Sequence, residues 1–360
     1  MYEMRYRHCI AEGTHYEIGF ALGNLLDSDN QQIESLVTPL FGGEPLTKNQ
    51  VEDTAAIFEK YCPGINDEIK GFSDAVNVTY RDMVIYSSYL TFIGGCSHFV
   101  ACQRSSAQRK IYHARNYDYN FDEYPTLITT RPIGKNFSTG FSCKVFGRFD
   151  GMNNKGLCVT TSAADVNHTK DLGNGFIFPI VVRAMLEQCS SVYEAKEMLN
   201  EMPYAEYRNF ILSDKEGVAV LVECSPENKS LKFIDHEEGY LCSANHFILD
   251  QCSIIKPVKH SCVRQALMER VLSQKDGISF EGIKTLLSEQ YPMGLTLPYY
   301  NSGMGTLWSI IYDSSTMSQY VCFGSPNKGA WHLVNSNDKP GCTEMIVSLE
   351  DIDAPDDLWE

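Results

Sequence analysis

The spacing of apolar residues changes near residue 95. Before it, apolar positions recur every three or four residues, as in VEDTAAIFEKY, INDEIKGFSDAV and YRDMVIYSSYL, which is the spacing of one face of a helix. Thr47 with Gln50, and Thr79 with Asp82, have the spacing of helix-capping pairs ahead of two of these runs. The pattern predicts three or four helices in this part of the chain.

After residue 95, short apolar runs alternate with polar turns. The predicted strands are SHFVACQ, KIYHARNY, TLITTRPI, CKVFGRFDG, LCVTTSA, NFILSD, VAVLVECS, SLKFID, GYLCSAN, TLWSIIYD and QYVCFG. Helices are predicted for FIFPIVVRAMLEQC, for VYEAKEMLNEM behind Ser191 and Glu194, and for SCVRQALMERVLSQ. Because strands and helices segregate along the chain, we expect an α+β fold rather than alternating βαβ units.

Composition excludes several classes of protein. Of the 360 residues, 43% are hydrophobic and 21% charged, as is usual for globular proteins. No apolar run approaches the ~20 residues of a membrane span, and the N-terminus has no apolar signal core, which predicts a cytoplasmic location. The net charge of −16 disfavours nucleic-acid and anionic-membrane partners, while a homo-oligomer stays open. The acidic stretch Glu344–Glu360 is interpreted as a solvated terminus.

The chain has thirteen cysteines, an odd number, and no Cys-x-x-Cys pair. Most of them lie in apolar runs such as GLCVT and YVCFG, where a reduced thiol packs as a small hydrophobic group. We therefore predict free thiols in a reducing compartment, without a disulfide framework, a zinc site or a cofactor.

Cys96 stands apart because Gly94 and Gly95 precede it. A lone cysteine is usually structural, and two glycines suit a bend. Alternatively, cleavage between Gly95 and Cys96 would make Cys96 an N-terminal residue. Its α-amino group, with a pKa of roughly 7.7–8.0 in peptides, could then act as the general base.

Further polar residues are candidates for the same chemistry, and each has a structural alternative. His98 would share a strand face with Cys96, although a satisfied or exposed histidine is the simpler interpretation. Arg115 and Asp118, in HARNYD, could orient a thiolate and hold a protonated amine, or could form a weak surface pair. Asn245 could donate to an oxyanion or could be a turn residue.

Calcium binding has one candidate segment, which begins at Asp118. Asp118, Asn120 and Asp122 have the spacing of the first ligands of an EF-hand loop. Glu123 stands where that loop requires glycine, and Thr129 stands where it requires a bidentate glutamate. We therefore predict no metal site.

A series of short motifs follows in a fixed order along the chain. They are GTHYEIG (13–19), INDEIKGFSDAVNV, Gly95-Cys96, RNYD (115–118), DGMNNKGL (150–157), ANHF (244–247), Ser261 with Arg264, and GTLWSIIYD (305–313). In this order they resemble the isopenicillin-N acyltransferase family of N-terminal-nucleophile hydrolases, which is related to the choloylglycine hydrolases and penicillin V amidases. The resemblance covers nearly the whole chain.

The resemblance implies a four-layer αββα sandwich, the N-terminal-nucleophile hydrolase fold, made as a precursor that cuts itself between Gly95 and Cys96. Residues 1–95 would form a helical N-terminal segment, and residues 96–360 would form the core. Cys96 would be the nucleophile. Arg115 would tune the thiolate, Asp118 would hold the α-amino group, and Asn245 would complete the oxyanion hole. Arg264, Ser302 and Thr161 would contact the substrate.

The sequence departs from the relatives at two positions. Arg115 stands where the penicillin acyltransferases have glutamine, and Ala163 stands where the amidases have a second pocket asparagine. We therefore expect a hydrolase or acyltransferase that acts on the linear, non-peptide amide of a small N-acyl molecule through a Cys96 acyl-enzyme. The alternatives are a non-catalytic binding protein on the same fold, with Gly95–Cys96 intact, and metal-dependent hydrolysis, for which ligand spacing is absent.

Overall fold

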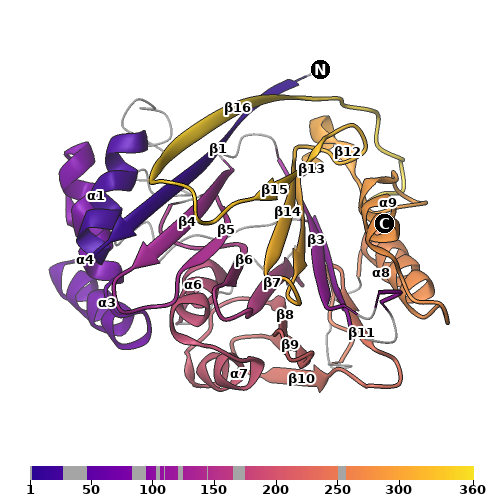
Figure 1. The fold of residues 1–360 in the computed structure, drawn as a ribbon, viewed down its shortest axis with the longest axis horizontal. Coiled ribbons are helices and arrows are strands. Elements are labelled where there is room, and N and C mark those ends of the chain that lie inside the picture. The colour runs from indigo at the N-terminus through magenta and orange to yellow at the C-terminus, as the bar shows by residue number, and fades with distance from the viewer. Residues whose placement is uncertain are drawn as a thin grey trace.

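The computed structural model describes residues 2–26, 47–82, 95–102, 106–108, 110–120, 125–143, 145–164, 175–249 and 257–360. These residues build two β-sheets that lie between helices (Figure 1). Strands β2 and β11 of one sheet contact β7, β8 and β9 of the other, so the two sheets pack face to face. The middle of the molecule is thus a double layer of sheet.

The larger sheet has nine strands in the order β10-β9-β8-β7-β6-β5-β4-β1-β16. Their bounds are β1 Tyr2–Gly13, β4 Thr126–Pro132, β5 Ser138–Ser142, β6 Asp150–Asn153, β7 Cys158–Ala163, β8 Arg208–Ser213, β9 Ala219–Cys224, β10 Lys229–Phe233 and β16 Gly341–Leu349. The pairing of β1 with β4 is parallel, and the other pairs in this sheet are antiparallel. The first and last strands of the chain are therefore neighbours.

The second sheet runs β11-β2-β3-β13-β14-β15, with β12 paired to β13. Its strands are β2 Gly95–Ala101, β3 Tyr112–Tyr119, β11 Tyr240–Ser243, β12 Pro298–Tyr299, β13 Met304–Asp313, β14 Ser318–Phe323 and β15 Trp331–Val334. Every residue of β2 and of β13 is buried. A strand covered on both faces has no polar face, which is why these segments do not alternate between apolar and polar residues.

Helices cover the outer face of each sheet. Those on the larger sheet's side are α1 His15–Leu26, α3 Lys48–Tyr61, α4 Ile65–Val76, α6 Phe178–Gln188 and α7 Val192–Glu201, and those on the other side are α8 Lys259–Leu272 and α9 Phe280–Ser288 (Figure 1). A short 3-10 turn, η3 Tyr300–Ser302, precedes β13. This arrangement is the predicted four-layer αββα sandwich, and it confirms the α+β class.

The capping signals in the sequence mark real helix starts. Thr47 and Gln50 form the predicted capping box of α3, and the Ser191 hydroxyl accepts from the Glu194 amide at the start of α7. The Thr79 hydroxyl likewise accepts from the Asp82 amide; the rest of that predicted helix lies outside the described residues. These predictions were possible because a cap involves residues only three positions apart.

The helical interpretation of the N-terminal segment is wrong for its first residues. Tyr2–Gly13 is a strand, inserted between β4 and β16. Its partners lie more than a hundred residues away in the sequence, so no local signal identifies it. The predicted strand CKVFGRFDG is wrong for its described residues before Asp150, and only Asp150 and Gly151 belong to a strand, β6. The chain bends ahead of it, where the Arg148 guanidinium turns back to the carbonyls of Val145 and Gly147.

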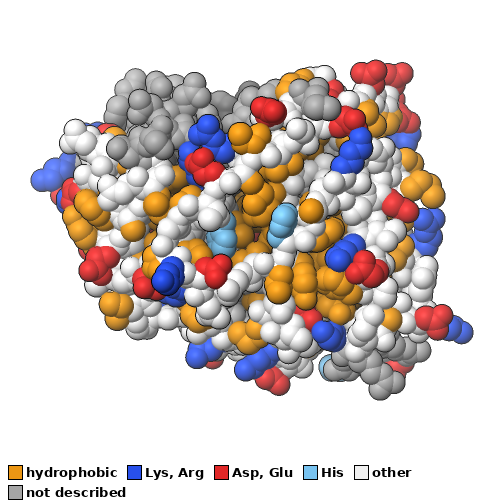
Figure 2. Space-filling view, turned by 45° about the horizontal axis from the view of Figure 1, so that its top comes forward, with side chains coloured by type: hydrophobic (Ala, Val, Ile, Leu, Met, Phe, Trp, Pro, Cys, Tyr) orange, Lys and Arg blue, Asp and Glu red, His pale blue; other side chains and the backbone are white. Residues whose placement is uncertain are grey.

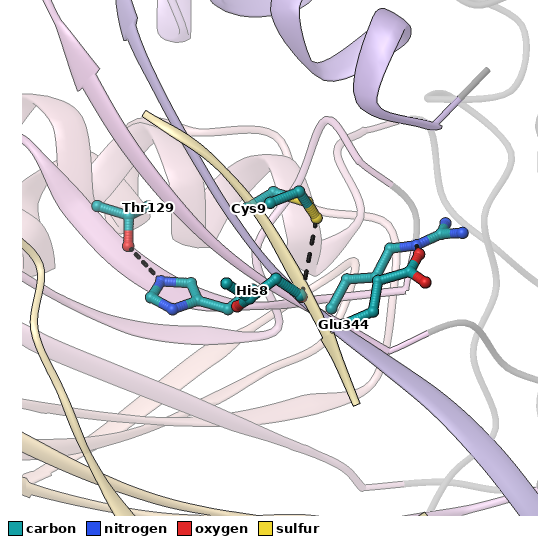
Figure 3. Close-up of a disulfide and its surroundings, with 7 residues drawn as sticks. His8, Cys9, Thr129 and Glu344 are labelled. Atoms are coloured by element: carbon teal, nitrogen blue, oxygen red, sulfur yellow. Dashed lines mark hydrogen bonds and ion pairs between the residues drawn. A yellow bond between two sulfur atoms is a disulfide. The ribbon is translucent and has the colours of Figure 1, made fainter. Parts of the chain in front are cut away.

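A disulfide joins Cys9 of β1 to Cys342 of β16 (Figure 3). The prediction that all cysteines are free thiols is therefore wrong for this pair. The two cysteines are 333 positions apart in the sequence and face each other in the register of the two strands. Only the pairing of the chain's first and last strands brings them together.

Charges are dispersed on the face seen in Figure 2. Acidic and basic side chains are scattered around a band of hydrophobic ones, without a large patch of one sign. The net charge of −16 is therefore not gathered on this face into an obvious site for a cationic partner.

Candidate active site

Cys96 is the second residue of β2, at the buried start of the strand. In the antiparallel register it faces Tyr117 of β3, and Gly95 faces Asp118. A Cβ added to Gly95 would lie 2.4 Å from the sulfur of Met304, much closer than real Cβ atoms approach. A side chain at position 95 would therefore require the flexible end of the Met304 side chain to move, and glycine avoids this.

Arg115 approaches the Cys96 sulfur directly. Its Nη2 atom donates to Sγ at 3.0 Å, while Nη1 donates to the Phe149 carbonyl at 3.1 Å and lies 3.2 Å from Oδ2 of Asp150. Asp150 is itself held by the indole N–H of Trp308 and the hydroxyl of Tyr312, at 3.0 and 2.9 Å. The guanidinium is therefore fixed in one orientation against the thiol.

The environment of the Cys96 thiol acts on its pKa in two directions. Burial raises the pKa and is the largest effect, and the Arg115 cation opposes it. The neighbouring carboxyl of Asp118 adds to the increase. In the uncut chain the thiol therefore stays protonated more readily than a free cysteine, and Arg115 is the main nearby group that favours the thiolate.

Asp118 is fully buried between β2 and β13. Its Oδ1 atom accepts from the Thr306 hydroxyl at 2.6 Å, and its Oδ2 atom lies 3.4 Å from Nη1 of Arg264. Burial raises the pKa of this carboxyl to about 6, although Arg264 and the Thr306 hydrogen bond oppose the increase. The position opposite Gly95 places a titratable carboxyl beside the bond that was predicted to break.

Arg264 and Asn245 hold the backbone of Cys96. Arg264 donates to the Cys96 carbonyl at 2.9 Å, to the Ser97 hydroxyl at 2.7 Å, and to Oδ1 of Asn245 at 2.7 Å. The same Oδ1 atom accepts the Cys96 N–H at 2.9 Å, and Nδ2 of Asn245 donates to the Ala163 carbonyl at 2.8 Å. Because two donors point at Oδ1, the amide has only one consistent orientation.

A family comparison decides the identity of the chain. The family described as Acyl-coenzyme A:6-aminopenicillanic acid acyl-transferase matches residues 104–328. The chain belongs to this family. The protein is accordingly an enzyme of an acyl-transferase family. The match begins after Cys96, so the assignment of the nucleophile rests on the contacts described above.

Solved structures with a similar fold share little sequence with this acyl-transferase family member. Penicillin V acylase from Agrobacterium tumefaciens is 15% identical with a TM-score of 0.47, covering 69% of this chain and 90% of that one. A mutant of the conjugated bile acid hydrolase from Clostridium perfringens is 14% identical with a TM-score of 0.44, covering 72% and 99%. The Caenorhabditis elegans ortholog of N-acylethanolamine-hydrolyzing acid amidase is 13% identical with a TM-score of 0.43, covering 61% and 93%. No curated protein matches the chain.

The structure brings most of the predicted site residues of this family member together. Cys96, Arg115, Asp118, Asn245 and Arg264 form one buried cluster. Arg264, which was predicted to contact substrate, donates to the Cys96 carbonyl.

Three other candidates have contacts or exposures of their own. The Thr161 hydroxyl donates at 3.3 Å to the Phe149 carbonyl that Arg115 also uses. Ser302 is exposed at the end of η3, and none of the hydrogen bonds described joins it to the cluster. His98 contacts Thr160 at 2.7 Å in a buried chain that continues to His113. Its contact supports the structural interpretation of this histidine.

Several residues that support the cluster were missed in the sequence. Asp150 orients Arg115, Thr306 holds Asp118, and the Ser261 hydroxyl accepts the Asn245 backbone N–H at 2.7 Å. All three lie in the motifs DGMN, GTLW and Ser261-x-x-Arg264 that carried the resemblance. Their motifs were a usable signal, but a supporting role could not be assigned without knowing which strands are neighbours.

Neither a membrane-spanning helix nor a metal-binding group was found in the described ranges. No described helix has the length and apolar character to cross a membrane. No cluster of three or more His, Cys, Asp or Glu side chains in those ranges could hold a metal ion. In the segment that resembles the start of an EF-hand loop, Asp118 accepts from the Thr306 hydroxyl and lies beside Arg264. Asp122 and Glu123 of that segment lie outside the described residues.

Proposed function

We propose that this enzyme is a cysteine N-terminal-nucleophile amidohydrolase or acyltransferase, activated by its own cleavage between Gly95 and Cys96. The observation that carries the proposal is the contact of the Arg115 guanidinium with the Cys96 sulfur, in a cluster that also holds the N–H and carbonyl groups of Cys96. A merely structural cysteine needs no such set of charged and polar neighbours.

Self-cleavage would begin with attack of the Cys96 sulfur on the carbonyl carbon of Gly95. The peptide C–N bond breaks, a thioester forms, and the thiol proton is transferred to the nitrogen, which becomes the α-amino group of Cys96. Water then hydrolyses the thioester and leaves a carboxylate on Gly95. Arg115 favours the attacking thiolate, and Oδ1 of Asn245 holds the N–H of the nitrogen that departs.

Amide turnover would use the α-amino group that cleavage releases. It takes the thiol proton, the thiolate attacks the acyl carbon of the substrate, and the departing amine recovers the proton. The resulting thioester passes its acyl group to water or to an acceptor amine, which regenerates the free thiol. Asp118 is the carboxylate nearest in register to the new amino terminus, which supports its proposed role in holding that group as an ammonium ion.

Asn245 is proposed to have two roles. Donation from Nδ2 to the oxyanion follows from the family resemblance. The contacts add a second role, because Oδ1 accepts from both Cys96 and Arg264 and so positions the nucleophile. The substrate is proposed to be a small N-acyl amide, and the location of the enzyme is proposed to be the cytoplasm.

The deciding experiment is the mass of the purified chain after reduction and denaturation. Wild type should give two fragments, one ending at Gly95 and one beginning at Cys96, and Cys96→Ala should stay whole. Cys102→Ala is the matched control, since Cys102 is also buried and follows the same strand; it should be cut normally.

Activity is then assayed with a panel of linear amides, such as N-acyl amino acids, N-acylethanolamines, conjugated bile acids and penicillin V. Alkylation should inactivate the enzyme even when Cys262, the exposed thiol among the described residues, is removed by Cys262→Ser. An uncut wild-type chain without turnover would favour the alternative, a non-catalytic binding protein. An uncut chain with full activity would refute the N-terminal-nucleophile mechanism.

A further inference from the structure

The last residues of the chain are docked against the protein, although the acidic composition predicted a solvated terminus. Asp351 accepts from the Asn301 backbone N–H at 2.9 Å, and the Ile352 N–H donates to the Pro298 carbonyl at 3.0 Å. Leu358 is completely buried. The C-terminus lies beside α8 (Figure 1). We call residues 350–360 the C-terminal tail.

One contact of the tail leads to Gly95. Leu358 packs in a small hydrophobic cluster with Leu297, Tyr299 and Met304. Met304 is the residue whose sulfur would collide with a Cβ on Gly95. Leu358 thus belongs to the hydrophobic cluster that contains Met304, and Met304 is the side chain packed against the glycine of the cleavage site.

A second contact leads to Arg264. The Trp359 ring lies 5.2 Å from the ring of His260 and is nearly perpendicular to it. The backbone N–H of His260 donates to the Leu358 carbonyl at 3.4 Å. Nδ1 of His260 is 2.7 Å from Nη2 of Arg264. Since a guanidinium only donates, Nδ1 must be the unprotonated acceptor. The same Nη2 atom donates to Asn245, and Nη1 donates to the Cys96 carbonyl.

The His260 ring must remain neutral for this contact. Burial, and then the Arg264 cation, lower the pKa of His260 to about 2. The proton is then on Nε2, which is buried and has no hydrogen-bond partner in the described part of the chain. The indole of Trp359, which is 45% exposed, lies perpendicular to this ring and is its aromatic neighbour.

We propose that the C-terminal tail positions the active site, with Trp359 and Leu358 acting through His260 and Met304 on Arg264 and Gly95. This inference rests on the proposed function and adds residues to it that are positioning rather than catalytic. Loss of the tail contacts should let Arg264 shift from the Cys96 carbonyl. Self-cleavage and turnover should then slow without loss of the fold.

The test compares wild type with Trp359→Ala, Trp359→Phe and Leu358→Ala. Displacement of a positioned group by about 1 Å can cost up to about 10²-fold in rate. We therefore expect Trp359→Ala to cleave itself at least about tenfold more slowly than wild type. Its amide turnover per mature molecule should fall by a similar factor. KM should change little, because the tail positions the nucleophile rather than the substrate. Trp359→Phe, which keeps an aromatic ring, should restore most of the rate.

Two controls separate positioning from general destabilisation. Leu349→Ala removes an equally buried leucine at the end of β16, and it should lower thermal stability without a specific loss of kcat. Asp357→Asn weakens only the exposed ion pair with Lys259 and should have little effect. Wild-type rates in Trp359→Ala, or equal losses in Leu358→Ala and Leu349→Ala, would overturn the proposal.

Hydrogen exchange measured by mass spectrometry tests the same link without activity. Peptides from β2 and α8 should exchange faster in Trp359→Ala than in wild type, and peptides from β8 and β9 should not change. If wild type neither cuts nor hydrolyses amides, the proposed function fails while this measurement still decides whether the tail fixes the cluster. Unchanged exchange in β2 and α8 would refute the positioning role.

Discussion

Asn245 offers the sharpest test at the scale of a single residue. Asn245→Ala removes the acceptor of the Cys96 N–H as well as the Nδ2 donor. We expect kcat to fall by about 10²–10³-fold, the range for losing one oxyanion donor, with a smaller change in KM. Because the Cys96 nitrogen also loses its acceptor, self-cleavage should slow too, so the mature fraction is counted before rates are compared.

The control for Asn245 is Asn209→Ala. Asn209 is equally buried, and its amide donates to the carbonyls of Ala244 and His246 on either side of Asn245, without contacting Cys96. If Asn245 only stabilised the turn, both variants would lower the thermal midpoint and leave kcat per mature molecule nearly unchanged. That result would remove Asn245 from the catalytic group.

Asp118 predicts a pH dependence of stability with a defined sign. Burial raises its pKa to about 6 from an ordinary value of 3.8. Between these values the folded chain keeps a proton that the unfolded chain has lost, so the stability contributed by this carboxyl falls as pH rises from about 4 to 6, by about 3 kcal/mol in total. The measurement uses the uncut Cys96→Ala chain, comparing thermal midpoints with those of Cys96→Ala/Asp118→Asn across this range. The Asp118→Asn chain should be the more stable one near pH 6, and its advantage in thermal midpoint should shrink towards pH 4. An advantage that does not change with pH would contradict the raised pKa.

At the scale of elements, a buried ion pair joins α4 to α6. Arg183 contacts both carboxylate oxygens of Glu68, and it also donates to Glu187 one turn along α6. The helices α1 and α4 cross so closely that a Cβ on Gly19 would overlap the Glu68 carbonyl, and one on Gly71 would overlap that of Tyr16. The ion pair thus fixes α4 to α6, and close backbone contact fixes α1 to α4.

Glu68→Gln should therefore lower the free energy of unfolding by about 3 kcal/mol, the low end for breaking a buried pair, since Glu187 still neutralises part of the charge. Urea unfolding of the uncut Cys96→Ala chain measures this. Lys70→Ala breaks the exposed pair with Asp74 on the same helix, leaves the Tyr16–Asp74 hydrogen bond in place, and should cost much less. Equal effects of the two substitutions would show that the Glu68 pair does not fasten the helices.

At the scale of the whole molecule, the two expected fragments are held together in more than one way. Strand β1 lies between β4 and β16, and Cys9 is bonded to Cys342. A cut wild-type chain should therefore run as one full-length band on a denaturing gel without reductant and as two bands with it. Cys342→Ser should give two bands in both conditions yet remain one species in native gel filtration, because the sheet still holds β1. Two bands from wild type without reductant would exclude the disulfide link.

Features that depend on residues close together in the chain were predictable before the fold was known. Capping pairs such as Thr47 with Gln50, the buried strand runs, and the α+β class could all be predicted, because a cap or a strand period is decided within a few residues. The roles predicted for Arg115 and Asp118 were implied by the family resemblance, and their closeness to Cys96 follows from two consecutive strands that pair.

The contacts between distant segments could be identified only in the folded chain. Three features join residues from separate parts of the chain: strand β1, the Cys9–Cys342 disulfide, and the docking of Leu358 and Trp359 near Arg264. Their sequence patterns are those of a polar N-terminus, free thiols and an acidic tail, because local composition carries no record of the partner. Burial between sheets, which sets the pKa of Cys96 and of Asp118, likewise exists only once those segments have packed together.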